Sequence, residues 1–79
     1  MTNLERYNKA FMDVLGVSEA DLDESLTFKG TPQWDSVAHL ALISELEDAF
    51  DVFFESNDIL HYGSYLNGIE ILKRYGVEF

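Results

Sequence analysis

Residues Asp35–Phe50 read DSVAHLALISELEDAF, and this stretch decides the fold. Large apolar residues recur along it at helical spacing: Val37, Leu40, Leu42, Ile43, Leu46 and Phe50. Because these residues cover more than one narrow stripe, we expect the helix to contact neighbours on two sides and to be the central element. Asp35 or Ser36 is its expected N-cap, since short polar side chains accept the free N–H groups of a first turn.

Upstream of this stretch, the pattern predicts another helix from about Asn3 to Leu15. Thr2 and Glu5 have the spacing of a capping box at its start, and Gly16 is placed to end it. Apolar residues at three- and four-residue steps form one face of this helix: Leu4, Tyr7, Phe11, Val14 and Leu15.

The segment Val17–Trp34 between these helices shows no sustained period. We expect a long ordered loop, attached to the core by three apolar anchors: Leu22, Leu26 and Phe28. Loops of this length without structure of their own are uncommon and often functional. Trp34 is expected in the core, because large aromatic side chains are mostly buried.

Downstream, two more helical segments are expected. Ser56–Asp58 is placed to cap a short helix that runs through Tyr62, and Gly63 or Ser64 opens the last helix. The last helix has an apolar face and stops at Gly76; that face holds Tyr65, Leu66, Ile69, Leu72 and Tyr75. Val52–Phe54 has strand propensity but no second strand to pair with, so we expect a connector.

Together these segments predict an all-α fold. We expect one domain over residues 1–79, a small bundle of three main helices plus one short helix.

The charge balance restricts the possible partners. Fifteen acids face five bases, giving a formal net charge of −10, and no Lys or Arg lies between Gly30 and Leu72. Such a stretch repels nucleic acid and anionic lipid and attracts proteins with basic patches, so we expect no nucleic-acid or membrane partner. The alternative is that an acid-rich surface only aids solubility.

The absence of certain features sets the expected compartment. The chain has no cysteine, so it forms no disulfide and no thiolate metal site. It also has no apolar run of membrane-spanning length and no secretion signal at Met1–Arg6. We therefore expect a soluble, cytoplasmic monomer.

The sequence does not support a catalytic triad or a metal site. Asp35, Ser36 and His39 supply the residue types of a catalytic triad, but the Gly-x-Ser-x-Gly turn is missing, and His39 is expected to be a solvated helix residue. Asp21–Ser25 hints at a calcium loop. Leu26 and Pro32, however, stand where that loop needs Gly and Glu. We expect neither catalytic residues nor a metal site.

The site that remains is Asp35-Ser36 at the start of the central helix. The simpler interpretation is a helix cap, because Asp and Ser are among the commonest N-cap residues. The functional interpretation is that a helix N-terminus, with free N–H groups and the positive end of the dipole, favours a phosphodiester on an exposed serine.

Over nearly its whole length the chain resembles the acyl carrier proteins. The matching features are Leu15–Val17 at the end of the first helix, the loop anchors Leu22 and Phe28, the signature Asp35–Val37, and the helix ending at Leu46–Asp51. The resemblance implies that a phosphopantetheinyl transferase attaches 4'-phosphopantetheine from coenzyme A to Ser36, beside Asp35. It further implies that the thiol of this arm carries acyl groups as thioesters, that a cleft between helices shields them, and that the chain is a carrier and no enzyme.

The resemblance also implies a docking surface for acyl-activating or acyl-transfer enzymes with basic patches. We expect it at Asp35, Val37, Glu47, Asp48, Glu55 and Asp58. Departures from the fatty-acid carriers at Trp34, Ala38, Ala41 and Phe53–Phe54 indicate a specialised bacterial member, in glycan or secondary metabolism. A peptidyl or aminoacyl carrier and a non-covalent acidic docking module remain as alternatives.

Overall fold

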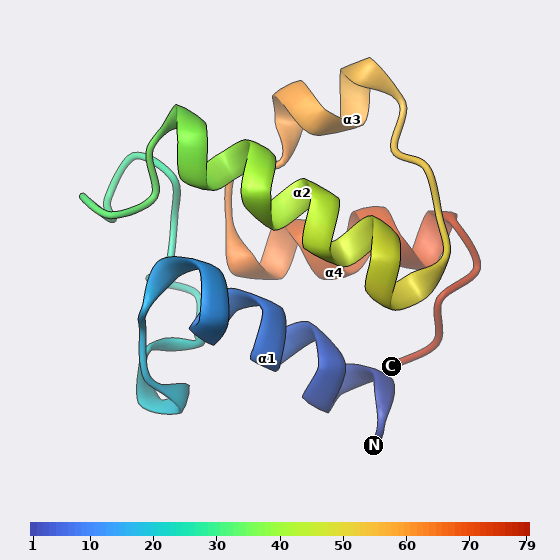
Figure 1. Cartoon of the computed structure of the whole chain (residues 1–79), viewed down its shortest axis with the longest axis horizontal. Coiled ribbons are helices and arrows are strands. Elements are labelled where there is room, and N and C mark those ends of the chain that lie inside the picture. The colour runs from blue at the N-terminus through green and yellow to red at the C-terminus, as the bar shows by residue number, and fades with distance from the viewer.

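The computed structural model describes all residues 1–79 and confirms the all-α prediction. Three main helices and one short helix are present: α1 (Asn3–Leu15), α2 (Ser36–Phe50), α4 (Tyr65–Arg74) and the short α3 (Ser56–His61). A single 3-10 turn, η1 (Glu19–Asp21), interrupts the long loop. In Figure 1, α2 crosses the middle of the molecule, with α1 below it, α3 above it and α4 behind it.

Local capping sets the ends of the main helices. Thr2 and Glu5 form the expected capping box, and Gly16 ends α1 with a φ of 69°. At α2 the cap is Asp35, whose side chain accepts the Ala38 N–H at 2.9 Å. Ser64 caps α4 in the same way by accepting the Asn67 N–H.

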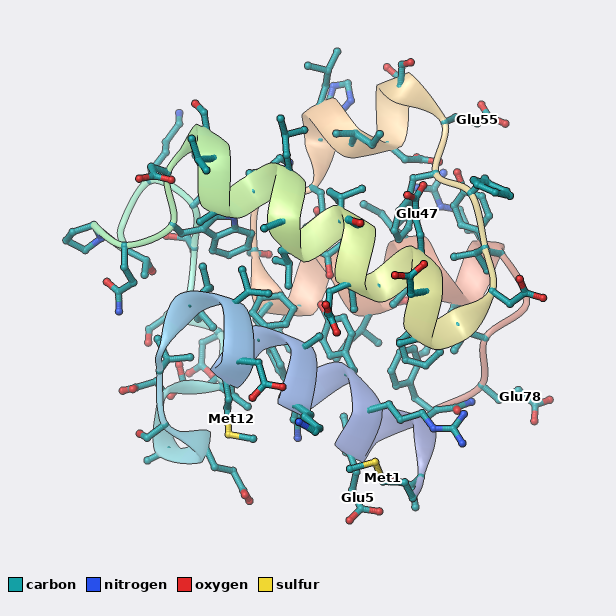
Figure 2. The ribbon with its side chains drawn as sticks, in the orientation of Figure 1. Met1, Glu5, Met12, Glu47, Glu55 and Glu78 are labelled. Atoms are coloured by element: carbon teal, nitrogen blue, oxygen red, sulfur yellow. The ribbon has the colours of Figure 1, made fainter.

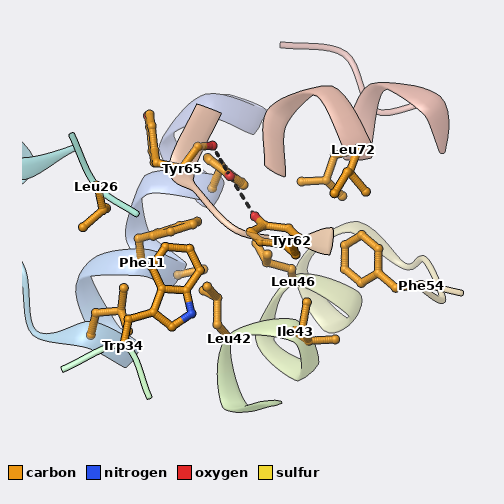
Figure 3. Close-up of a cluster of buried hydrophobic side chains, with 14 of the residues drawn as sticks. Phe11, Leu26, Trp34, Leu42, Ile43, Leu46, Phe54, Tyr62, Tyr65 and Leu72 are labelled. Carbon is orange, nitrogen blue, oxygen red and sulfur yellow. Dashed lines mark hydrogen bonds between the residues drawn. The ribbon is translucent and has the colours of Figure 1, made fainter. Parts of the chain in front are cut away.

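The core is rich in aromatic residues, and Trp34 belongs to it as expected, with 1% of its surface exposed. Figure 3 shows Trp34 beside Phe11 and Leu42, between α1 and α2. Buried side chains come from all three main helices and from the loops; they are Tyr7, Ala10, Phe11, Leu15, Leu26, Trp34, Leu42, Ile43, Leu46, Phe54, Tyr62, Tyr65, Ile71, Leu72 and Val77. The core is thus assembled around the inner face of α2.

Two buried tyrosine hydroxyls connect α1 to the junction between α3 and α4. Tyr7 donates to the Tyr65 carbonyl at 2.6 Å, so Tyr62 donates to the Tyr7 hydroxyl, 2.7 Å away (dashed in Figure 3). Gly68 of α4 lies directly against both hydroxyls, and a Cβ there would be 2.0 Å from the Tyr62 oxygen. A glycine at this position therefore allows α4 to approach the tyrosine pair.

Several residues expected in the core lie outside it. Leu4 is exposed in the first turn of α1, one turn before the first buried residue, Tyr7. Val37 and Leu40 are exposed on α2, because α3 has only six residues and is too short to cover them. α2 has neighbours on two sides, as expected, but its N-terminal half keeps part of its apolar surface exposed.

The long loop is attached at the three expected residues, Leu22, Leu26 and Phe28. Leu26 is buried and Leu22 is partly buried. Phe28 is 36% exposed, and its ring packs edge-on against Trp34 and His39. An isolated antiparallel bridge between Thr27 and Ser64 holds this part of the loop beside the start of α4.

None of the helices combines the length and the apolar character needed to cross a lipid bilayer.

Candidate functional site

Ser36 is the first residue of α2, and its side chain is exposed. Because the Asp35 carboxylate caps the helix, the Ser36 hydroxyl is not needed for that role. The free N–H groups and positive dipole end of a fifteen-residue helix lie beside the hydroxyl. The two expected site residues are therefore brought together with different tasks, Asp35 as the cap and Ser36 as the free hydroxyl.

An apolar groove of about 500 Å³ begins at Ser36. It lies between the N-terminal half of α2, α3 and the loop before α2, and its apolar walls are Phe28, Leu40, Ile59, Leu60 and Tyr62. Lys29 lines it as well, and is the only Lys or Arg that does so. The residues that were expected in the core but lie outside it, Phe28 and Leu40, thus form the walls of this groove.

His39, one helical turn after Ser36, lines the inner side of the groove. It is partly buried and makes two hydrogen bonds, to the Trp34 indole nitrogen at 3.1 Å and to the Ile59 carbonyl oxygen at 2.9 Å. Its ring also stacks on the Trp34 ring. The expectation of a solvated His39 is therefore wrong, because α3 folds back and presents a backbone carbonyl to this face of α2.

Tyr62 also lines the groove and is held in place by its hydroxyl. Burial raises the pKa of Tyr62 and of its partner Tyr7, so both hydroxyls stay neutral and hydrogen-bonded at physiological pH. Since the ring is 1% exposed and packs against Phe11, Trp34 and Phe54, this wall of the groove is rigid.

Three of the expected docking residues face solvent. Val37 is 78% exposed, one residue after Ser36. Asp48 lies exposed near the end of α2, and Glu55 extends away from the ribbon at the start of α3 (Figure 2). These three are free to contact another molecule.

The other three acids of the expected docking surface are engaged within the chain. One of them is Asp35, whose carboxylate caps α2. The Glu47 carboxylate accepts the Phe54 N–H at 3.0 Å. Asp58 has a side chain only 13% exposed; it pairs with Arg74 at 2.9 Å and accepts the Tyr75 hydroxyl. The Tyr75 hydrogen bond, aided by Arg74, lowers the pKa of Asp58. The Glu47 and Asp58 carboxylates fix the segment between α2 and α4.

Sequence reasoning missed the groove side chains Lys29, Ile59 and Leu60, and it misassigned His39. The spacing of Ser36 and His39 places them on one face of α2, which was the available signal. No comparable signal indicated Ile59 or Leu60, since their place depends on how α3 folds back.

The structure holds no cluster of three or more His, Asp or Glu side chains placed to bind a metal ion. No protein-family model matches the chain.

Proposed function

We propose that this chain is an acyl carrier protein in which the Ser36 hydroxyl receives a 4'-phosphopantetheine arm. The observation that carries the proposal is an exposed serine hydroxyl that a neighbouring cap leaves free, at the mouth of an apolar groove. Hydroxyl and groove are adjacent, so a group tethered at Ser36 can reach the groove.

The residues around Ser36 fit a phosphodiester. The uncapped N–H groups of the first turn of α2 and the positive end of its dipole favour an anion at the hydroxyl. Apart from the capping carboxylate of Asp35, no acidic side chain occupies the first turn of α2, and Lys29 lines the same groove as Ser36. When bound, the arm supplies a terminal thiol that holds an acyl group as a thioester. The chain has no thiol of its own, because it contains no cysteine.

The groove suits an apolar cargo. Its volume of about 500 Å³ falls within the range of small-molecule sites, roughly 300–1,000 Å³. Apolar side chains dominate its walls, which favours an acyl chain over a charged aminoacyl group. The peptidyl or aminoacyl carrier is therefore the second choice within the carrier class.

The surface around Ser36 fits partner enzymes that make mainly apolar contact. Val37 and Leu60 are 78% and 82% exposed. Phe53, which follows the other end of α2, is 86% exposed. Ala38 and Ala41 stand nearby on α2, and Asp35 directly precedes Ser36. The exposed acids Asp48 and Glu55 lie farther away, at the end of α2 and before α3. We propose a phosphopantetheinyl transferase and acyl-activating or acyl-transfer enzymes as partners, with basic side chains around an apolar centre.

The chain contributes position and no catalysis of its own. A flexible tether raises the concentration of a cargo at a docked enzyme to about the millimolar range. We place the protein in the cytoplasm, as a monomeric carrier of a specialised bacterial acyl pathway, with no nucleic-acid or membrane partner.

The test is modification by coenzyme A and a promiscuous phosphopantetheinyl transferase, followed by intact-mass spectrometry. We expect one arm on the wild-type chain and none on Ser36→Ala. Ser56→Ala is the matched control, because Ser56 is also the exposed first residue of a helix and follows an acidic residue, yet it does not line the groove. An unmodified wild-type chain contradicts the proposal.

The non-covalent docking module is a second candidate, favoured by the base-free stretch from Gly30 to Leu72. It predicts that partner affinity is unchanged in Ser36→Ala and falls in Asp48→Lys with a weaker salt dependence. Asp48 is the better test position than Glu47, because the Glu47 carboxylate accepts a backbone hydrogen bond and its replacement disturbs the loop.

A further inference from the structure

We infer that His39 holds α3 against the groove in only one protonation state, so that protonation of His39 opens the groove. The two hydrogen bonds of its ring connect Trp34 before α2 to Ile59 in α3. The consequence for the cargo rests on the proposed function, while the protonation-dependent contact itself does not.

The partners of the ring determine its tautomer. The indole nitrogen of Trp34 is a donor only, so His39 Nδ1 must accept and carries no proton. The Ile59 carbonyl is an acceptor only, so His39 Nε2 must carry the proton and donate. The closed arrangement therefore requires a neutral imidazole with its proton on Nε2.

A second proton is incompatible with this arrangement. The second proton would bind to His39 Nδ1. The N–H of Nδ1 and the indole N–H of Trp34 would then point at each other, with their nitrogens 3.1 Å apart. Trp34 is 1% exposed and cannot turn its N–H to water, so the His39 ring has to move. Movement of the ring takes its Nε2–H away from the Ile59 carbonyl.

Besides the His39 bond, α3 is held by the partly buried Ile59 side chain, which packs against the core, and by few polar contacts. None of its residues is buried, and its N-cap, Glu55, makes no side-chain capping bond. The remaining polar attachments of α3 and its cap are Asp58 to Arg74 and Tyr75, and the Glu55 N–H to the Tyr75 hydroxyl. None of these residues lines the groove, so loss of the His39 contact frees the wall made by Ile59 and Leu60.

No neighbouring acid offsets a charge on His39. Lys29 from the loop lines the same groove, and the Tyr62 ring packs edge-on against the His39 ring. Asp35 lies one turn earlier, with its carboxylate on the Ala38 N–H. On α3, Asp58 turns to Arg74 and His61 bonds the Asn57 carbonyl. None of the ion pairs of the chain includes His39. A protonated His39 therefore has no partner for its second N–H in the closed arrangement, so its protonation favours opening.

The test uses the Ser36→Ala chain, which cannot carry an arm, so its outcome is independent of the proposed function. Nitrogen NMR at pH 8 reports the His39 tautomer, and the indole N–H resonance and fluorescence of Trp34, the single tryptophan, follow its hydrogen bond from pH 8 to pH 5. Amide exchange over residues 56–61 reports the opening of α3.

We expect the Nε2–H tautomer of His39 at pH 8. The Trp34 signals should change with pH along a curve for the binding of a single proton. Protection of residues 56–61 should fall about tenfold between pH 8 and pH 5, the effect of one hydrogen bond. His39→Gln should abolish the pH dependence, and His61→Gln, the control, should retain it. An Nδ1–H tautomer, or a Trp34 signal and an α3 protection that stay constant over this range, overturns the inference even if His39→Gln fails to fold.

Discussion

Gly68→Ala gives the sharpest test of how α4 packs, because helix propensity predicts a gain in stability and packing predicts a loss. In a helix interior, alanine is more favourable than glycine by about 1 kcal/mol. In this structure, however, the new Cβ would lie 2.0 Å from the Tyr62 hydroxyl oxygen and 2.3 Å from that of Tyr7, where an ordinary contact is 3.4 Å or more. Something in the buried pair must move.

The expected cost follows from these contacts. Overpacking of a filled core costs about 1–3 kcal/mol. A buried hydroxyl that loses its partner costs about another 1–3 kcal/mol. After the gain in propensity, we expect Gly68→Ala to lower the free energy of unfolding by about 3 kcal/mol, which in a domain of this size lowers the melting temperature by more than about 10 °C.

The assay is urea and thermal unfolding followed by circular dichroism. Gly63→Ala is the matched control, because a Cβ there meets no atom closer than 3.8 Å. We expect its stability to stay within about 0.5 kcal/mol of wild type. If Gly68→Ala is as stable as Gly63→Ala, the close approach of α4 to the tyrosine pair is refuted.

Three further predictions concern stability. Burial raises the pKa of both Tyr7 and Tyr62, so above about pH 10 the unfolded chain loses two protons that the native state keeps. The free energy of unfolding should therefore fall by about 2.7 kcal/mol per pH unit. Ionisation of these tyrosines before unfolding, seen by ultraviolet absorbance, would contradict this prediction. Added salt should raise the melting temperature, because the net charge of −10 repels itself; a constant or lower melting temperature in calorimetry counts against it. Tyr75→Phe removes the hydroxyl that donates to Asp58 and accepts from the Glu55 N–H, so amide exchange should speed up over residues 55–61 and stay unchanged in α1; equal exchange in both segments would show that this hydroxyl does not hold α3.

The main helices were predictable because their signals are local. The Thr2–Glu5 capping box, Gly16 and the Asp35 cap each act within a few residues, and the structure has all three. The aromatic core was predictable in kind as well, since Trp34 is large and apolar and has 1% of its surface exposed.

The groove was not predictable in detail because it depends on contacts across the chain. Phe28, Leu40 and Leu60 look like core residues in sequence, and only the shortness of α3 leaves them as walls. His39 looked like a solvated residue because its acceptor is a backbone carbonyl twenty residues away. For the same reason, Asp58 gave no sign that Arg74 and Tyr75 would engage it.

The most direct test of the central claim is to locate the arm on the chain. After treatment with coenzyme A and a phosphopantetheinyl transferase, the chain is digested and its peptides are sequenced by tandem mass spectrometry. The proposed function predicts one 4'-phosphopantetheine, on Ser36 and on no other serine. A chain that every such transferase leaves unmodified, or a modification on Ser44 or Ser56 in place of Ser36, would contradict it.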